Sequence, residues 1–219
     1  MNSSCLQIFT KAPIEGYCKT RLIPHLGKKE TVNIHMAMVQ NTITMAKTVM
    51  GIDIQLWCKP SKEHPFFQRL AIENDISLFD QTGESLGSIM KDAARQAATV
   101  YKNIIQIGTD CPYIDSKYLE LSLESLNDDN PVVIGPATDG GYVLLAQQKY
   151  YPDIYNDIDW GTSLVLHQLE SNLNKQGIQY SKLPVLNDID TIDDYNNWIN
   201  MNSIAQLMQN AQEGKKSIG

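Results

Sequence analysis

Two hydrophobic patterns alternate along the chain. Short apolar runs predict strands, and they occupy residues 5–10, 52–58, 76–79, 103–107, 131–134, 142–146 and 178–183. Apolar residues at steps of three and four predict amphipathic helices over residues 28–50, 66–72, 84–101, 116–126 and 163–175, with a last helix beginning at Thr191. Strands separated by helices predict a mostly parallel sheet flanked by helices on both faces.

No linker, low-complexity tract or internal repeat interrupts this alternation, so we expect a single α/β domain over residues 1–219. Its core spans about residues 5–200, and the tail at 214–219 is expected to fray. Ligands of open α/β sheets bind at the carboxyl ends of the strands. Four loops with unusual chemistry follow predicted strands here, and we expect them to meet at one edge of the sheet.

The first of these loops is basic. Pro13 and Gly16 shape it, and Lys11, Lys19 and Arg21 are placed to converge on an anion. Backbone amides and fixed cations are how loops after a first strand bind phosphates. The loop is neither a Walker A sequence nor G-x-G-x-x-G, so spacing alone leaves a solvated basic loop equally open.

The second loop is Gly108-Thr-Asp-Cys-Pro112, in which Asp110 follows an apolar strand. A carboxylate at a strand end suits Mg²⁺, which typically takes one or two carboxylates and leaves its other positions to water and phosphate. The alternative is that Asp110 caps the following turn. Cys111 is expected to pack structurally.

The third loop contains Asp139-Gly-Gly141 between two strands, a sequence that by itself signals a tight turn. Adjacent glycines also allow a ligand to approach the backbone closely. The fourth loop has four aspartates in seven residues from Asp188 to Asp194. Thr191 and Asp194 fit a helix cap, whereas Asp188 and Asp190 repel each other, a cost that a bound cation would offset.

Composition excludes several classes. The 42% hydrophobic and 20% charged residues match an average globular protein and exclude a disordered, collagen-like or coiled-coil chain. The formal net charge of −7 argues against nucleic acid or an anionic membrane as partner. That total conceals a segment from Lys11 to Lys29 with five basic residues and one acid, a local net charge of +4.

Cysteines and histidines give no metal or disulfide signature. The four cysteines are widely spaced, and the four histidines show no zinc-binding spacing. Reduced thiols in a cytoplasmic protein are therefore expected. We expect no signal peptide, because no apolar stretch precedes Cys5. We also expect no membrane span, because no apolar run approaches the ~20 residues that cross a bilayer.

Five motifs in order give the chain a specific resemblance. They are Phe9-x-Lys-Ala-Pro with Lys19-Thr-Arg-Leu, Gly108-Thr-Asp-Cys-Pro, Gly135-Pro-Ala-x-Asp-Gly-Gly-Tyr, Asp159-Trp-Gly-Thr and Asp188-Ile-Asp-Thr-x-x-Asp. Over about residues 5–200 the chain resembles the bacterial GT-A-like nucleotide-diphospho-sugar transferase superfamily. The most similar branch is catalogued as a domain of unknown function and labelled as a glycosyltransferase family.

The resemblance implies a single-domain Rossmann-like GT-A fold and assigns roles to residues. A divalent cation, Mg²⁺ or Mn²⁺, would bind Asp110 and Asp190, and catalysis would involve Asp110, Lys19 and Asp139. The resemblance also implies two sets of binding residues. Those for the nucleotide phosphates are Lys11, Ala12, Pro13, Lys19, Arg21 and Thr109. Those for the acceptor are Asp139, Gly140, Gly141, Tyr142 and Trp160.

Two departures from the family pattern bear on the reaction. Glycosyltransferases usually carry D-x-D at the metal strand, whereas Gly108 stands two residues before Asp110. The last motif usually reads D-T-P-E-D-L, and here Ile192, Asp193 and Tyr195 replace three of those residues. The start of the helix is retained despite these changes, so we expect the site at this motif to be retained as well.

The leading hypothesis is a metal-dependent transferase using a nucleotide-activated donor and a small-molecule acceptor, most simply a glycosyltransferase using a sugar nucleotide. A nucleotidyltransferase resembling guanylyltransferases, acting on a small phosphorylated acceptor, remains open. So does a non-catalytic nucleotide-sensing protein. No motif of the sequence specifies the donor, the acceptor or the oligomeric state.

Overall fold

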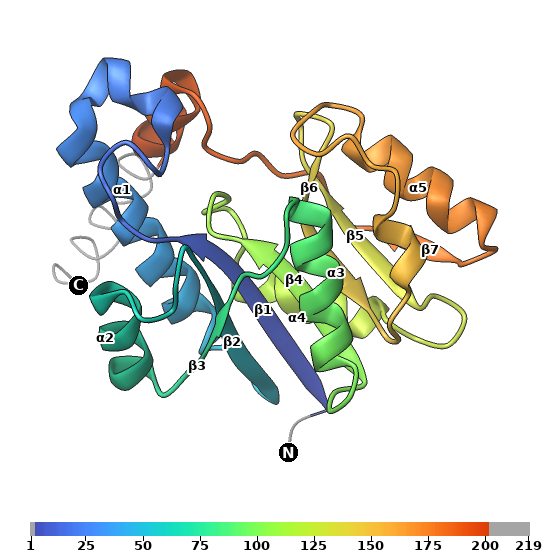
Figure 1. Ribbon diagram of the computed structural model, residues 1–219. Coiled ribbons are helices and arrows are strands. Elements are labelled where there is room, and N and C mark those ends of the chain that lie inside the picture. The colour runs from blue at the N-terminus through green and yellow to red at the C-terminus, as the bar shows by residue number, and fades with distance from the viewer. Residues whose placement is uncertain (1–2, 202–219) are drawn as a thin grey trace, which may run out of the picture.

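The computed structural model describes residues 3–201, and one seven-stranded sheet runs through them (Figure 1). The strand order is β3-β2-β1-β4-β6-β5-β7. β6 runs antiparallel to both its neighbours, and the other neighbouring pairs are parallel. The strands are β1 (Ser4–Lys11), β2 (Ile52–Lys59), β3 (Ser77–Asp80), β4 (Asn103–Gly108), β5 (Val132–Pro136), β6 (Tyr142–Gln147) and β7 (Tyr180–Lys182). The predicted mostly parallel α/β sheet is confirmed.

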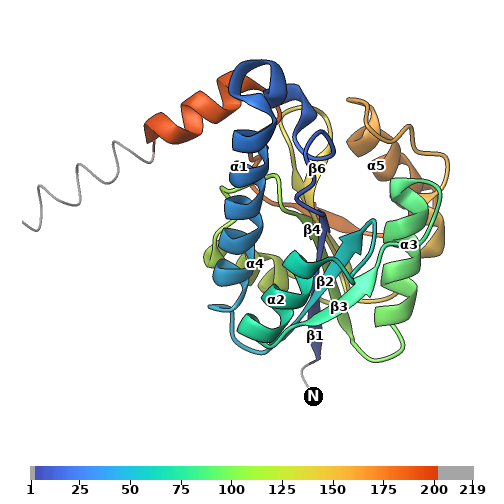
Figure 2. The ribbon, with the colours of Figure 1, turned by 60° about the vertical axis from the view of Figure 1, so that its left-hand side comes forward.

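Helices cover both faces of the sheet, as Figure 2 shows. The helices are α1 (Ile23–Ala46), α2 (Pro65–Asn74), α3 (Leu86–Ala97), α4 (Ser116–Ser125) and α5 (Val165–Lys175), with 3₁₀ turns η1 (Thr20–Leu22) and η2 (Pro152–Tyr155). The larger apolar cluster packs α1, α2 and α4 against one face, and a second cluster packs α3, η2 and α5 against the other. Each helix therefore has an apolar stripe that one sheet face buries.

Helix boundaries differ from the sequence pattern where turn chemistry intervenes. α1 starts at Ile23 rather than residue 28, and Gly27, with φ of 79°, interrupts it. Glycine tolerates that left-handed conformation, so the break occurs there. α3 starts at Leu86, because Ser85 and Ser88 form a reciprocal cap. The last strand is shorter than predicted and covers only Tyr180–Lys182.

A ladder of hydrogen-bonded glutamines crosses the central strands beneath α3. Gln7 of β1 donates to Gln55 Oε1 and to the carbonyl of Ala93 in α3, each at 2.9 Å. Gln106 of β4 donates to Gln7 Oε1 and to the carbonyl of Met90 in α3. The bonding continues along the sheet through Tyr155 and Gln147. These buried amides are satisfied, and they fix α3 to the sheet.

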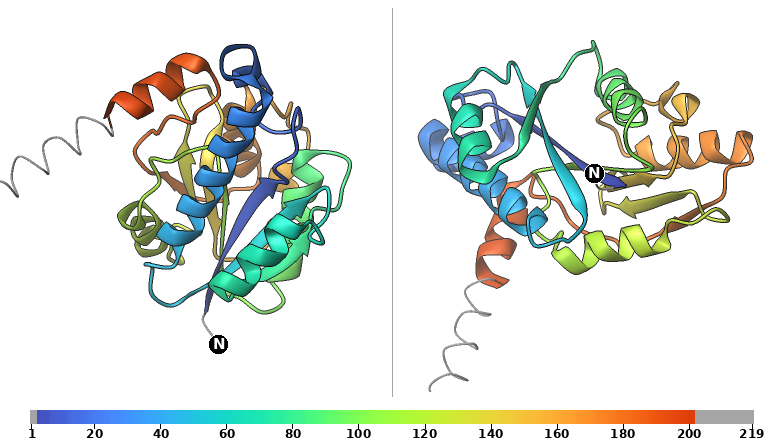
Figure 3. Two further views of the ribbon diagram at one scale, coloured as in Figure 1. Left: turned by 90° about the vertical axis from the view of Figure 1, so that its left-hand side faces the viewer. Right: turned by 90° about the horizontal axis from the view of Figure 1, so that it is seen from below.

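The last helix of the described chain begins beside α1 and projects away from it (Figure 3, left). Residues 192–201 are helical, as expected from Thr191. Tyr195 and Trp198 of this helix pack against a small cluster formed by Ile34, Met38 and Ile189. The tail predicted to fray at 214–219 lies outside the described residues. Within residues 3–201, no helix combines the length and apolar character that crossing a bilayer requires.

Candidate functional site

Lys19 connects three segments that are far apart in the sequence. It follows the loop after β1 and has a left-handed backbone conformation, with φ of 47°. Its side chain is only 4% exposed, and Nζ lies 2.7 Å from Oδ1 of Asp110. The same ammonium donates to the carbonyl of Ile189 in the last loop. One buried cation thus joins the loops after β1, β4 and β7.

A second ion pair links the first loop to the last. Arg21 Nη1 contacts Asp190 Oδ2 at 2.5 Å, and the guanidinium side chain is 70% exposed. An exposed pair of this kind contributes at most about 1 kcal/mol to stability. Its value here is positional, because it places the last acidic loop beside the first basic loop.

Asp110 lies directly beyond β4, beside the end of β1. Its backbone carbonyl accepts from the Ile189 amide at 2.9 Å, which fixes the last loop against this strand end. Desolvation opposes ionisation of the Asp110 carboxyl, but the charge and hydrogen bond of Lys19, with smaller contributions from His35 and Lys11, outweigh it and lower the pKa. Asp110 is therefore ionised at neutral pH while its side chain remains 53% exposed to the cavity.

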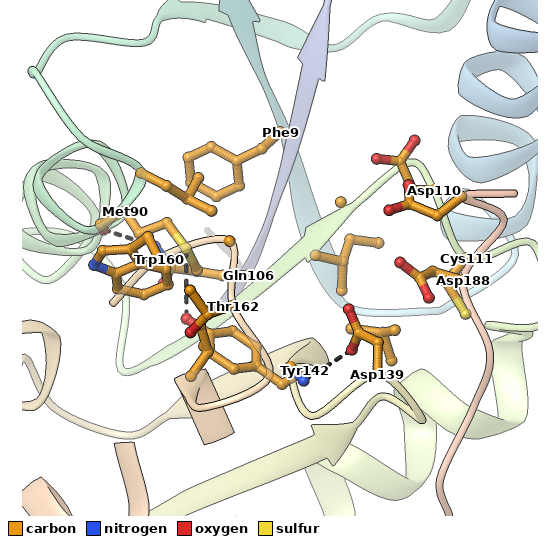
Figure 4. A pocket seen from close by; sticks show the side chains of 18 of the residues that line it. Phe9, Met90, Gln106, Asp110, Cys111, Asp139, Tyr142, Trp160, Thr162 and Asp188 are labelled. Atoms are coloured by element: carbon orange, nitrogen blue, oxygen red, sulfur yellow. Dashed lines mark hydrogen bonds between the residues drawn. The ribbon is translucent and has the colours of Figure 1, made fainter. Parts of the chain in front are cut away.

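Three further carboxylates, those of Asp139, Asp188 and Asp190, line the same cavity as Asp110. Asp139 sits in the turn between β5 and β6, where its Oδ1 accepts from the Gly141 amide at 2.8 Å. Burial, reinforced by the charges of Asp139 and Asp190, raises the pKa of Asp188 to about 6. Figure 4 shows Asp110, Asp139 and Asp188 along one side of the cavity. We call these four aspartates the acidic wall.

The opposite side of the cavity is apolar and aromatic (Figure 4). The cavity has a volume of about 330 Å³. Phe9 of β1, Met90 of α3, Tyr142 of β6 and Trp160 of the loop before α5 line it, with Leu86 at the start of α3. We call these five residues the apolar wall. Phe9, Leu86 and Met90 were not predicted as site residues, because in the sequence an apolar side chain that lines a cavity has the same pattern as one in a core.

Two glycines hold the loop of residues 159–164 in place. A Cβ built on Gly87 would lie 2.3 Å from Trp160 Nε1, so the indole rests directly on the α3 backbone. A Cβ on Gly140, whose φ is 89°, would lie 2.3 Å from the carbonyl oxygen of Ser163. The Asp139-Gly-Gly turn and this loop therefore interlock, and both position the cavity lining. Gly140 itself acts by this packing and does not line the cavity.

Five of the six residues expected at the phosphates are absent from the cavity lining. One of them, Lys19, adjoins the cavity through its ion pair with Asp110, and the other four lie apart from it. The Ala12 amide already donates to the Lys59 carbonyl, and Thr109 is buried, with its hydroxyl 3.4 Å from that of Thr10. Lys11 is exposed and lies over the Tyr17 ring at 5.7 Å. The remaining one is Pro13. Lys19, Arg21, Asp110 and Asp190 are the expected residues that the structure brings together.

Cysteine and histidine take no part in the acidic wall. All four cysteines are unpaired and buried, and the Cys111 thiol donates to the Asn187 carbonyl, as expected of a packing residue. Within residues 3–201, no three Cys, His, Asp or Glu side chains converge closely enough to form a complete metal site. A cation here would take its remaining ligands from water and substrate.

More than half of the chain matches one protein family. The family described as "Uncharacterized protein conserved in bacteria (DUF2064)" matches residues 42–162, more than half of the 219 residues. The chain belongs to this family. Asp110, Asp139 and Trp160 lie inside the matched segment, whereas Lys19 and Asp190 lie outside it. No curated protein matches the chain.

Solved structures share the fold over nearly the whole chain. A "putative nucleotide-diphospho-sugar transferase" from Desulfovibrio desulfuricans G20 superposes with a TM-score of 0.84 at 27% identity, covering 92% of this chain and 88% of that one. A nucleotidyl transferase from Methanothermobacter thermautotroptrophicus gives 0.62 at 14% identity, covering 90% and 96%. A cytidylyltransferase from Leptospira borgpetersenii gives 0.58 at 16%, covering 89% and 84%. The chain thus has the GT-A-like fold suspected from its motifs.

Proposed function

We propose that this protein is a metal-dependent transferase that uses a nucleotide-activated donor, with glycosyl transfer from a sugar nucleotide as the leading reaction. The observation that carries the proposal is that Arg21, Asp110 and Asp190 line one cavity, with the buried Lys19 paired to Asp110 directly behind it. The likeness to a protein described as a nucleotide-diphospho-sugar transferase supports it. Cations suited to phosphates and carboxylates suited to a metal are the components that such a transfer requires.

The chemistry of the acidic wall fits Mg²⁺ or Mn²⁺ bound by two carboxylates, with water and substrate as the other ligands. All four side chains offer carboxylate oxygens, the ligand type these hard cations prefer. The raised pKa of Asp188 reflects burial and unrelieved repulsion from Asp139 and Asp190, which a dication would reduce. We assign the metal to Asp110 and Asp190. A bound cation would neutralise the diphosphate and stabilise its departure as a leaving group.

The chain's own residues would bind the donor phosphates and orient the acceptor. Lys19 and Arg21 supply positive charge on the phosphate side of the acidic wall, and their pairing with aspartates positions both side chains beforehand. Asp139, fixed by the Gly141 amide, is the proposed base that takes a proton from the acceptor. The interlocked loop of residues 159–164 keeps Trp160 against the acceptor side of the cavity.

Nucleotidyl transfer is the second candidate, favoured by one observation. The strand end carries a single aspartate, Asp110, with Gly108 in place of the first aspartate of a D-x-D pair. The reaction products separate the candidates. Release of pyrophosphate from a nucleoside triphosphate indicates nucleotidyl transfer, and release of a nucleoside diphosphate from a sugar nucleotide indicates glycosyl transfer.

The proposed function is tested by a thermal-shift panel of nucleoside triphosphates and sugar nucleotides, with and without Mg²⁺ or Mn²⁺. A ligand at about 100 times its Kd stabilises by about 2.7 kcal/mol, which for a chain of this size raises Tm by about 5–10 °C. We expect one nucleotide class to give a shift that requires the metal. Asp110→Asn should abolish the metal-dependent part of the shift.

A matched control is Asp115→Asn. Asp115 caps α4 through the Tyr118 amide at 2.8 Å and is absent from the cavity lining. This variant should lower the melting temperature slightly and leave the nucleotide shift intact. If no nucleotide raised Tm, the proposed function would be contradicted. If Asp110→Asn left the metal-dependent shift unchanged, the metal assignment would be contradicted.

A further inference from the structure

The cations at the cavity are already committed to its own acids. Lys19 is paired with Asp110, and Arg21 with Asp190. Within residues 3–201, Asp139 and Asp188 have no cationic partner at salt-bridge distance. The five salt bridges in that part of the chain join other groups. Four carboxylates against two cations leave a net charge of about −2 at this end of the cavity.

Donor binding does not reverse that sign. One divalent cation cancels the remaining charge, and a bound nucleotide diphosphate then adds negative charge of its own. An acceptor bearing a phosphate or carboxylate would enter a region where, among the described residues, the cavity lining contains no cation besides Arg21. Like charges in a partly desolvated cavity repel strongly.

The apolar wall gives the acceptor molecule apolar contact area but few groups that are free to form hydrogen bonds. Gln106 is saturated, because its amide donates to Gln7 and Met90 and its oxygen accepts from Tyr155. The Thr162 hydroxyl donates to the Asp159 carbonyl. Stacking and apolar contact with Phe9, Trp160 and Leu86 are what this side provides.

We propose, on the basis of the proposed transferase function, that the acceptor is an uncharged hydroxyl compound with an apolar or ring face, and not a phosphorylated small molecule. Its apolar face lies on the apolar wall, and its hydroxyl points to the acidic wall. In the transfer, the hydroxyl oxygen bonds to the donor sugar carbon while the bond from that carbon to the diphosphate oxygen breaks. The diphosphate leaves with the electron pair, and Asp139 takes the hydroxyl proton.

The test compares two probes that differ by one phosphate, phenyl β-D-glucopyranoside and its 6-phosphate, titrated into the full-length protein by ligand-observed NMR. We expect the uncharged glucoside to bind and the phosphate ester to bind at least about tenfold weaker, with the difference shrinking at high salt because charge repulsion is screened. Equal or tighter binding of the 6-phosphate overturns the proposal, and so does the absence of glucoside binding.

Variants locate the binding. Leu86 and Leu121 are both partly exposed leucines, at 46% and 41%, but only Leu86 lines the cavity. Leu86→Ala should weaken glucoside binding several-fold, and Leu121→Ala on α4 should leave it unchanged. Trp160→Ala should abolish it, and Trp160→Phe should retain most of it, with thermal melts confirming that each variant is folded. Equal effects of the two leucine variants would overturn the placement on the apolar wall.

The experiments distinguish a failure of the uncharged-acceptor proposal from a failure of the proposed transferase function. The nucleotide shift depends on the metal and on Asp110, whereas the glucoside titration needs neither nucleotide nor metal. A metal-dependent nucleotide shift together with preferred binding of the 6-phosphate would keep the transferase function and reject the uncharged acceptor.

Discussion

Replacing Gln7 by leucine is expected to destabilise the protein severely, although the two side chains are similar in size. Gln7 is fully buried in β1, the central strand of the β2-β1-β4 segment. It makes three hydrogen bonds, each of 2.9 Å, to Gln55, to the Ala93 carbonyl and to Gln106. Leucine can make none of them and leaves one Gln106 amide hydrogen buried without a partner.

The magnitude follows from counting these bonds. Each neutral hydrogen bond contributes roughly 0.5–1.5 kcal/mol net, and an orphaned buried donor adds to the loss. Leucine recovers part of this through apolar burial, so we expect a net loss of about 3 kcal/mol. At roughly 2–4 °C per kcal/mol for a chain of this length, Tm falls by about 6–12 °C.

Urea denaturation followed by circular dichroism measures this loss, with the m-value as a check that the unfolded state is unchanged. Gln40→Leu is the matched control, because Gln40 is exposed on α1, and it should stay within about 0.5 kcal/mol of the wild type. Because Gln106 also holds the Met90 carbonyl of the apolar wall, Gln7→Leu should further weaken glucoside binding. A loss below about 1 kcal/mol would refute the stabilising role that we assign to the glutamine ladder.

Three further perturbations test the acidic loops. The pKa of Asp188 is about 6, above the value near 4 of an unfolded aspartate, so stability falls as pH rises from about 4 to about 6. Asp188→Asn should therefore raise Tm at neutral pH but not below about pH 4, and a rise at both would contradict this. The Asp194 carboxylate accepts hydrogen bonds from the amides of Thr191 and Asp190. Asp194→Ala should therefore lower the free energy of unfolding in urea by about 1 kcal/mol and weaken metal binding. An unchanged urea midpoint would argue against the helix cap. Gly140→Ala should cost more than about 2 kcal/mol in the same assay, because its Cβ would meet a backbone oxygen at 2.3 Å, and a neutral result would refute the interlock.

The sheet was predictable because its strands are short apolar runs separated by helices. Strand positions agree with the pattern within a residue or two for β1, β2 and β4, where helices cover both faces of the sheet and most residues are buried. β7 was overestimated, since only three residues pair with β5 at that edge. The antiparallel direction of β6 followed from the Asp139-Gly-Gly turn, which joins it directly to β5.

The glutamine ladder could not be predicted from single residues. In the sequence, a glutamine within an apolar run only interrupts the strand pattern. The strand register places Gln7 opposite both Gln55 and Gln106, and this is what lets their side chains form hydrogen bonds. The α1 boundary failed for a related reason. Gly27 is tolerated within α1 as a kink, whereas the sequence pattern suggested that a helix begins after it.

The site shows the same division between local and long-range information. Sequence alone placed Lys19 and Arg21 on one loop and Asp110 and Asp190 on others, because each motif is a short chemical pattern. It assigned the bases to phosphate and the acids to metal, whereas the structure pairs them, Arg21 with Asp190 across 169 positions of sequence. A lysine that is 4% exposed needs a partner charge, so the fold must deliver Asp110 to Lys19 whatever ligand the loops bind. The basic segment and the acidic strand ends are thus one electrostatic unit, and its leftover charge, at Asp139 and Asp188, is what selects against an anionic acceptor.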